Sequence, residues 1–176
     1  VSFGSVVLGT DTATTVNVNN QMTATTGSIT IQSTFLNVAA DLNSTTADIN
    51  LQLGTGGLAL ANNLTAADDV RLDTTGAITQ TAGIITAANL GVRSQSDVSL
   101  TRNNLVSTNF AAAAHDVTFN NASTGLLTIG TVGSITNFFG TSGLGDSGVT
   151  TITTSGALSV TSTSNSDGGL NLKSSG

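Results

Sequence analysis

Large apolar side chains return about every 20 residues along this chain of 176 residues. They fall on two interleaved tracks whose steps vary by no more than one residue around that value. The first track is Leu8, Ile29, Ile49, Val70, Leu90, Phe110, Ile129, Val149 and Leu170, and the second is Val18, Val38, Leu58, Ile78, Val98, Val117, Phe138 and Leu158. A single coil of this length cannot bury its own apolar face, whereas stacked coils bury it against one another. The period therefore predicts a solenoid.

A short local unit accompanies the period: Asp or Gly, then an apolar residue, any residue, and a second apolar residue. It occurs with Asp at 48–51, 69–72, 97–100 and 116–119, and with Gly, in the same place or one residue earlier, at 27–31, 57–60, 156–160 and 169–172. Such alternation, flanked by Gly, Asp and Asn, is typical of a short half-buried strand. We therefore expect an all-β fold of about eight or nine stacked coils, which at ~4.8 Å per coil gives a stack roughly 40 Å long.

The composition supports this fold class and excludes two others. Glutamate is absent and lysine occurs once, so the residues that favour surface helices are nearly missing. Hydrophobic residues make up 38% of the chain, which argues against disorder. The abundant threonines suit a pleated surface, and stacked asparagine side chains can hydrogen-bond from coil to coil. Proline, which would remove a donor from the strand ladder, is absent.

Charge and residue usage also limit the chemistry. The net charge is −6 with only four Lys and Arg residues, so we expect no nucleic-acid partner. The absence of cysteine excludes disulfides and thiolate-based zinc sites. No apolar run is long enough to predict a transmembrane segment. The length predicts one solenoid segment over 1–176, which we expect to be part of a longer protein or a stacking subunit. Because the chain opens at Val1 rather than Met, we interpret it as processed or as a segment cut from a longer chain.

Three stretches depart from the repeat. Residues 109–115, with four successive alanines, predict a short turn or loop. Residues 140–148 are rich in Gly and Ser, and predict a protruding loop. The last residues, 173–176, are interpreted as a frayed end or as a cut within a longer chain.

Few residues are candidates for chemistry. His115 is the only histidine and could be a general base or a metal ligand, although a surface imidazole before a strand is the simpler interpretation. Asp68 and Asp69 are the only adjacent carboxylates, and Arg71 shares the face of Asp69 on an extended strand. Arg93 is expected about one coil further along. These residues suggest a carboxylate–guanidinium site. The simpler interpretation is that Asp69 occupies the recurrent corner before a strand.

Calcium binding is only weakly indicated. The calcium-binding nonapeptide needs tandem copies of Gly-Gly-x-Gly-x-Asp. Only 143–146 (Gly-Leu-Gly-Asp) and 167–169 (Asp-Gly-Gly) come near it, once each. We therefore predict no cofactor, no metal ligand and no catalytic residue.

Taken together, the repeat units and the abundance of Thr, Asn and Ala resemble the filamentous haemagglutinin-like repeats of two-partner-secreted bacterial exoproteins and of related autotransporter passengers. The stretch 67–80 (Ala-Asp-Asp-Val-Arg-Leu-Asp-Thr-Thr-Gly-Ala-Ile-Thr-Gln) carries the resemblance best. It implies a right-handed parallel β-helix, secreted or on the bacterial surface, that serves adhesion or biofilm formation. The family's secretion domain carries an Asn-Pro-Asn-Gly type signature, which a chain without proline cannot contain. The resemblance therefore implies that this chain is a segment of the shaft and not the secretion domain.

Three functions are consistent with these features. The first is a structural or adhesive shaft with no enzymatic activity. The second is a subunit that polymerises head to tail, because open coil ends present unpaired backbone groups. The third is a β-helix protein that binds or cleaves polysaccharides through the face of Asp69 and Arg71. The expected partners are copies of the chain or neighbouring coils, and host-cell or matrix glycans.

Overall fold

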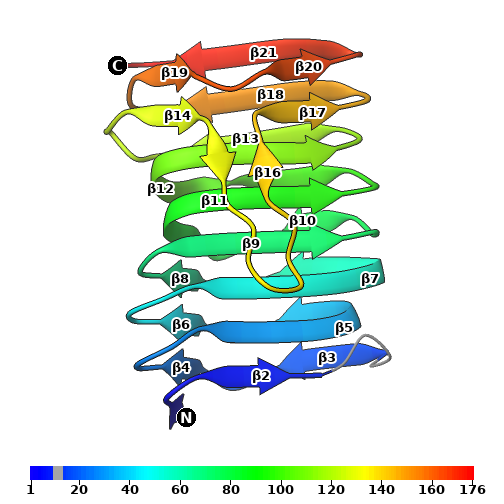
Figure 1. Ribbon diagram of the computed structural model, residues 1–176, viewed down its shortest axis with the longest axis vertical. Coiled ribbons are helices and arrows are strands. Elements are labelled where there is room, and N and C mark those ends of the chain that lie inside the picture. Colours follow the sequence, from blue (N-terminus) through cyan, green and yellow to red (C-terminus); the bar gives the residue numbers. More distant parts are fainter. Residues whose placement is uncertain (10–13) are drawn as a thin grey trace.

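The protein is a parallel β-solenoid of about eight coils, with the N-terminus at one end and the C-terminus at the other (Figure 1). The computed structural model describes residues 1–9 and 14–176, and in these residues every regular element is a strand. The strands are β1 (Ser2–Phe3), β2 (Val6–Leu8), β3 (Thr15–Val18), β4 (Met22–Ala24), β5 (Ile29–Val38), β6 (Leu42–Ser44), β7 (Ile49–Leu60), β8 (Leu64–Ala66), β9 (Asp69–Thr74), β10 (Ile78–Gln80), β11 (Ile85–Ser94), β12 (Val98–Ala114), β13 (Val117–Asn121), β14 (Leu127–Ile129), β15 (Thr131–Val132), β16 (Thr141–Ser142), β17 (Leu144–Asp146), β18 (Val149–Thr154), β19 (Leu158–Val160), β20 (Ser164–Ser166) and β21 (Gly169–Ser174).

Each complete coil has three sides, which we call A, B and C. Side A comprises residues 6–8, 29–33, 49–53, 69–74, 89–94, 109–114, 127–129 with 144–146, and 158–160 with 164–166. Side B comprises 15–18, 35–38, 57–60, 78–80, 98–100, 117–121, 149–154 and 169–174. Side C comprises 2–3, 22–24, 42–44, 64–66, 85–87 and 105–106. The near strands in Figure 1 run left to right while the chain rises, which is the right-handed sense expected for parallel crossovers.

The apolar columns of the core confirm the central part of both sequence tracks. On side A, Ile29, Ile49, Val70, Leu90, Phe110 and Ile129 lie over one another in register and are all fully buried. On side B the same holds for Leu58, Ile78, Val98 and Val117, each at most 2% exposed. The fold class predicted from the period is therefore confirmed, and the dry column is what holds successive coils together.

The ends of the first predicted track are wrong. The side A column begins at Val6, which pairs with Ile29, instead of at Leu8. It finishes at Val160 instead of Val149. The predicted last member, Leu170, lies on side B. A constant step fails here because corners differ in length and because one coil carries an insertion.

The ends of the second predicted track are wrong as well. Val18 and Val38 belong to a neighbouring column of side B that continues to Leu60. Phe138 lies outside the coils, in an isolated bridge with Ile135. Leu158 lies on side A, in parallel pairing with β14.

The insertion is a hairpin of residues 131–142. Val98 pairs with Val117 on the next coil, and Val117 in turn pairs with Thr150, so the later coil is much longer than the one before it. The chain leaves side A after β14 and returns at β17, where the Gly143 amide donates to the Gly130 carbonyl at 2.7 Å. Between them β15 and β16 pair in antiparallel fashion. The loop predicted at 140–148 is therefore displaced: residues 144–146 form strand β17, and the protrusion lies earlier.

Two other predicted irregularities are ordinary strand. Residues 109–114 belong to β12 and pair in parallel with β11, so the loop predicted at 109–115 is wrong. Alanines are poor strand formers by themselves, but here they fill positions that are covered on both faces, where Ala111 and Ala112 are at most 1% exposed. The end predicted to fray, 173–176, is also largely ordered: Lys173 and Ser174 pair with β18.

Buried asparagines complete the ladder where side C ends. Asn121 donates its side-chain Nδ2 to the Val106 carbonyl at 2.9 Å and accepts the Val106 amide on Oδ1 at 2.9 Å, the two bonds that a strand residue would make. Asn104 accepts the Ile85 amide in the same way at 2.9 Å. Both asparagines are at most 3% exposed. These side chains satisfy backbone groups that would otherwise be buried without partners.

Candidate functional site

The hairpin 131–142 lies across the outer face of side A (Figure 1). Val132 is 2% exposed, and a Cβ on Gly91 would come within 3.1 Å of it, so the glycine makes room for the hairpin. Ala111, the outward-facing residue on the next coil, is completely buried. Small outward residues on two successive coils thus let the hairpin pack closely, and this is the one place where the described solenoid carries an added element.

Arg71 ties the hairpin to the solenoid. Its Nε donates to the Gly133 carbonyl at 2.9 Å, and its NH1 donates to Asp48 Oδ2 at 2.7 Å and to Asn50 Oδ1 at 3.2 Å. Its NH2 donates to Asp69. Arg71 and Asp69 are 7% and 8% exposed. The structure therefore brings these two residues together, as the strand alternation predicted, and buries them beneath the hairpin in an ion cluster whose polar atoms are already engaged.

Arg93 is not part of that cluster. Its guanidinium carbon stands 4.7 Å from the centroid of the Phe139 ring, in a cation–π contact. Its NH1 lies 3.9 Å from Asp73 Oδ2, a long ion pair. Burial raises the pKa of Asp73 above its usual value, and the charge of Arg93 offsets this only in part. Arg93 thus fixes one aromatic ring of the hairpin.

The tip of the hairpin is a tight turn over residues 135–138. The Ile135 amide donates to the Phe138 carbonyl at 3.1 Å, and the Phe138 amide donates to the Ile135 carbonyl at 3.0 Å. Asn137 has φ of 67°, the left-handed region, which Asn tolerates better than other side chains apart from Gly. The turn sets Asn137 and Phe139 on the solvent side while Phe138, 3% exposed, packs beneath.

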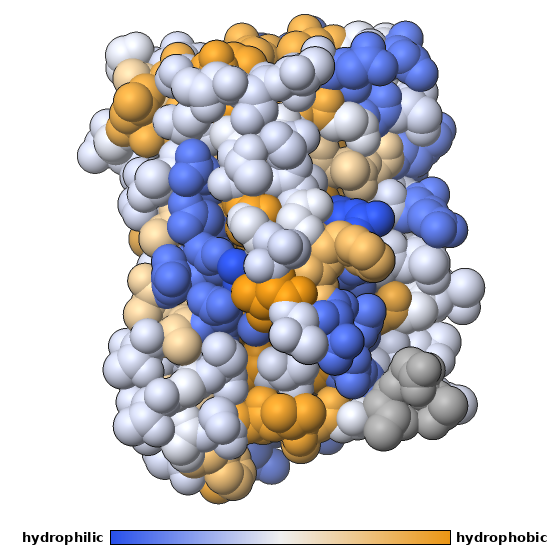
Figure 2. All heavy atoms as spheres, in the orientation of Figure 1, coloured by the Kyte–Doolittle hydropathy of each residue, from blue (hydrophilic) through white to orange (hydrophobic). Residues whose placement is uncertain are grey.

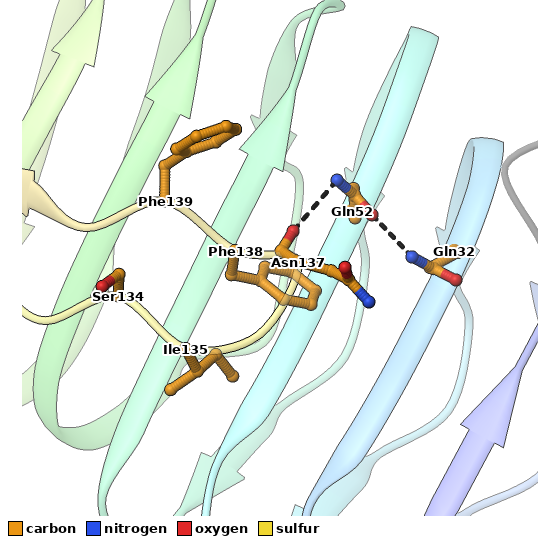
Figure 3. A pocket seen from close by; sticks show the side chains of 7 residues that line it. All are labelled: Gln32, Gln52, Ser134, Ile135, Asn137, Phe138 and Phe139. Atoms are coloured by element: carbon orange, nitrogen blue, oxygen red, sulfur yellow. Dashed lines mark hydrogen bonds between the residues drawn. The ribbon is translucent and has the colours of Figure 1, made fainter.

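A groove of about 790 Å³ lies between this turn and side A (Figure 3). It is lined by Gln32, Gln52, Ser134, Ile135, Asn137, Phe138 and Phe139. Gln32 donates to Gln52 at 2.6 Å, and Gln52 donates to the Asn137 carbonyl at 3.2 Å. Figure 2 shows this part of the surface as apolar hairpin atoms flanked by hydrophilic columns. We take this groove as the candidate site.

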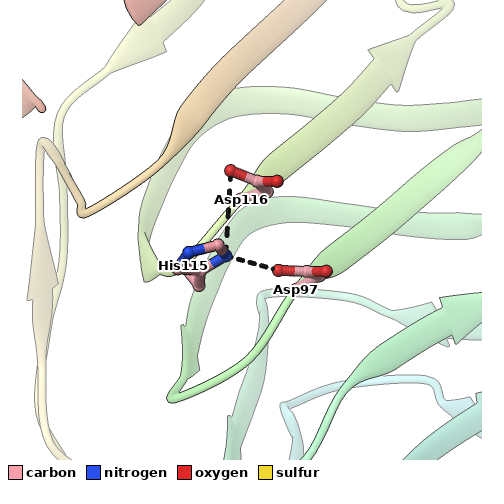
Figure 4. Close-up of side chains that lie close together, drawn as sticks. All are labelled: Asp97, His115 and Asp116. Carbon is pink, nitrogen blue, oxygen red and sulfur yellow. Dashed lines mark hydrogen bonds and ion pairs between the residues drawn. The ribbon is translucent and has the colours of Figure 1, made fainter. Parts of the chain in front are cut away.

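His115, the only histidine, forms a separate cluster at the corner between sides A and B (Figure 4). Its Nδ1 lies 2.8 Å from Asp97 Oδ1 and 3.8 Å from Asp116 Oδ1. The hydrogen bond to Asp97 and the charge of Asp116 raise the pKa of His115. These three residues are spaced so that one ligand atom from each could reach a divalent cation. All three residues are at least partly open to solvent. Asp116 Oδ1 also accepts the Val149 amide at 2.6 Å, so contacts of this cluster link successive coils.

Asp48, Asp68 and Asp69 form a second carboxylate group. The negative charge of Asp69 and then burial raise the pKa of Asp68. Arg71 already neutralises the other two carboxylates, so this group is part of the ion cluster around Arg71 described above.

Of the residues considered for calcium, Asp146 is 5% exposed and points into the stack. Its Oδ2 accepts hydrogen bonds from Thr150 and Ser166, and its Oδ1 has no partner among the described residues. The described part of the chain does not bring Asp146 and Asp167 into a group of three ligands.

Comparisons with known proteins do not assign the chain to a family: no family model matches it, and neither a curated protein nor a solved structure is significantly similar to it. None of the residues at 1–9 or 14–176 forms a helix long and apolar enough to cross a membrane. Function must therefore be inferred from the geometry of the molecule.

The groove is a feature that sequence reasoning misses entirely. The repeat assigns Phe138 to a track and gives no place to Ile135 and Phe139, although three large apolar residues so close together are a usable signal of an insertion. Gln32 and Gln52, one period apart, carry a second signal.

Proposed function

We propose that this chain is a structural and adhesive β-helical shaft segment of a secreted or surface-exposed bacterial protein, without enzymatic activity. The observation that carries the proposal is that polar side chains bond to the next coil. Outward amides and carboxylates form ladders: Asn37 to Asn17 at 3.3 Å, Asn89 to Asp69 at 2.6 Å, and Asn109 to Asn89 at 2.8 Å. Polar groups arranged in this way support a repeating stack, as the resemblance to haemagglutinin-like repeats also suggests.

The residues considered for catalysis support the same proposal. Arg71 and Asp69 lie beneath the hairpin with their charges paired, which leaves little surface for a substrate. His115 bonds to Asp97 on the preceding coil. These contacts fit a shaft whose side A is covered in part by the hairpin better than they fit an enzyme with a substrate cleft.

Surface labelling tests the proposal. Antibodies raised against residues 1–176 should label intact cells of the organism that encodes the chain, or detect it in the culture medium. In-frame deletion of the segment from the gene should lower attachment to surfaces or biofilm mass. Labelling that appears only after lysis, with attachment unchanged, would contradict the proposal.

End-to-end stacking of copies is the second candidate. The first and last coils leave core-facing apolar side chains exposed, including Phe3 (40%), Val160 (49%) and Leu170 (42%). Apolar coil ends with unpaired strand edges favour addition of further coils. Negative-stain microscopy of the purified chain decides this: long uniform fibres support stacking, and a monomer of 17.4 kDa by sedimentation speaks against it.

A further inference from the structure

We propose that the groove between the hairpin turn and side A binds a neutral oligosaccharide, a site that gives the proposed adhesive shaft its ligand. The groove is lined by residues of two distant parts of the sequence, Gln32 and Gln52 from side A and 134–139 from the hairpin (Figure 3). Its volume of about 790 Å³ lies in the usual range for ligand pockets. The inference rests on the proposed adhesive function, and three properties of the lining point to the ligand class.

The first property is the absence of charge. The seven lining residues are amides, a hydroxyl and apolar side chains. Two cations bond to the hairpin near the groove, and both are already engaged: Arg93 contacts Asp73 and the Phe139 ring, and Arg71 is paired with Asp48 and Asp69. An acidic ligand would find no unpaired counter-charge among these residues and would approach a chain of net charge −6. A neutral ligand needs no counter-charge and is not repelled by the net charge of the chain.

The second property is an aromatic ring held ready at the surface. Phe139 is 69% exposed, although large apolar side chains usually avoid water, and Ile135, which also lines the groove, is 37% exposed. The guanidinium of Arg93 at 4.7 Å orients the Phe139 ring. Arg93 covers one face of the ring, and the electron-rich face opposite it is the one that would attract the weakly positive C–H groups on one side of a pyranose ring.

The third property is a set of fixed amides with bonding capacity left over. Gln32 donates to Gln52, which donates to the Asn137 carbonyl, so the chain of bonds orients both glutamine side chains. Within the described residues, Gln32 Oε1, the Asn137 side-chain amide and the Ser134 hydroxyl have no protein partner. An amide offers a donor and an acceptor side by side, which matches sugar hydroxyls.

A peptide fits the groove less well. Strand addition needs an open sheet edge, whereas the strands below the groove are already paired on both sides, β7 with β5 and with β9. A purely apolar ligand would leave the amides without partners. The combination of an exposed ring, oriented amides and no charge favours a saccharide over both.

The test is a ¹H–¹⁵N NMR titration of the purified chain with cellotetraose and with tetra-N-acetylchitotetraose, and with a heparin-derived tetrasaccharide as the acidic comparison. We expect at least one neutral probe to shift the backbone signals of 134–139 and the side-chain signals of Gln32 and Gln52. A dissociation constant on the order of 1 mM or below is expected for a single open site. The acidic probe should bind more weakly.

Two variants test the assigned residues. Phe139→Ala should weaken binding about fivefold or more, because it removes the stacking ring. Asn137→Gly keeps the left-handed φ and removes only the amide, and should weaken binding about threefold or more. Leu126→Ala, which removes a 54% exposed apolar side chain away from the groove, is the matched control and should leave binding unchanged.

Three results would overturn the inference: no shift with either neutral probe, tighter binding of the acidic one, or unchanged affinity in both groove variants. None of them bears on the shaft itself, which is tested by surface labelling and attachment. Conversely, labelling confined to lysed cells would overturn the shaft proposal while the titration still reports on the groove.

Discussion

Replacement of Arg71 by methionine should destabilise the protein substantially, although Arg71 lies outside the apolar core. The arginine is surrounded by Asp48, Asp69, Asn50 and the Gly133 carbonyl, and its side chain is 9% exposed. Removing one partner of a buried ion pair costs about 3–5 kcal/mol, because the other charge is left buried without compensation. The side chains of Asp48 and Asp69 are 17% and 12% exposed, so some water reaches them and we expect a loss of about 3 kcal/mol, at the lower end of that range.

Urea unfolding followed by circular dichroism measures this change. The midpoint should fall with the slope unchanged, and the melting temperature should fall by about 6–12 °C in a chain of this length. A second change, Asp69→Asn in the Arg71→Met background, should recover part of the loss because it removes the stranded charge. The matched control is Arg102→Met, since Arg102 is exposed and its side chain bonds, within the described residues, only to the Thr81 carbonyl. A loss within about 0.5 kcal/mol for Arg71→Met, as expected for the control, would refute a stabilising role of the ion cluster around Arg71.

Three further predictions concern the core, the hairpin and pH. Phe110 and Phe119 are stacked at 4.2 Å and completely buried, so Phe110→Ala should lower the free energy of unfolding by about 3–5 kcal/mol in urea titrations, and a loss below about 1 kcal/mol would contradict the packing. Gly91→Val places a branched side chain against Val132, so limited proteolysis should cut 131–142 faster while the coils stay folded; unchanged cleavage would mean that the hairpin does not rest on this position. Because its neighbours raise the pKa of His115, its stabilising effect is complete below about pH 6.5 and disappears as pH rises through the higher folded-state value. The melting temperatures of wild type and His115→Gln should therefore converge as the pH is raised from about 6 to about 9, and a constant difference would contradict the assignment.

The ion cluster around Arg71 and the groove show which parts of the structure could not be predicted from the sequence. The pairing of Asp69 with Arg71 follows from strand alternation, and their common face is predictable. Their burial is not, because it depends on Gly133, which comes 62 residues later. In the same way Gln52 meets Asn137 across 85 residues, and no local pattern encodes that distance. Length changes at corners then shift the ends of the tracks, since each side chain in a strand changes face when the register moves by one residue.

The amino-acid sequence by itself determined the all-β class, the coil of about 20 residues and the central apolar columns, because periodic burial is a local property that repeats in every coil. It also determined that the outer amides would form ladders, since identical positions in successive coils lie over one another. Only the tertiary structure decided where the insertion leaves the stack, which face it covers, and that Arg71 lies beneath it. Those outcomes depend on how the hairpin packs against Gly91 and Ala111, which lie on coils that precede it in the sequence.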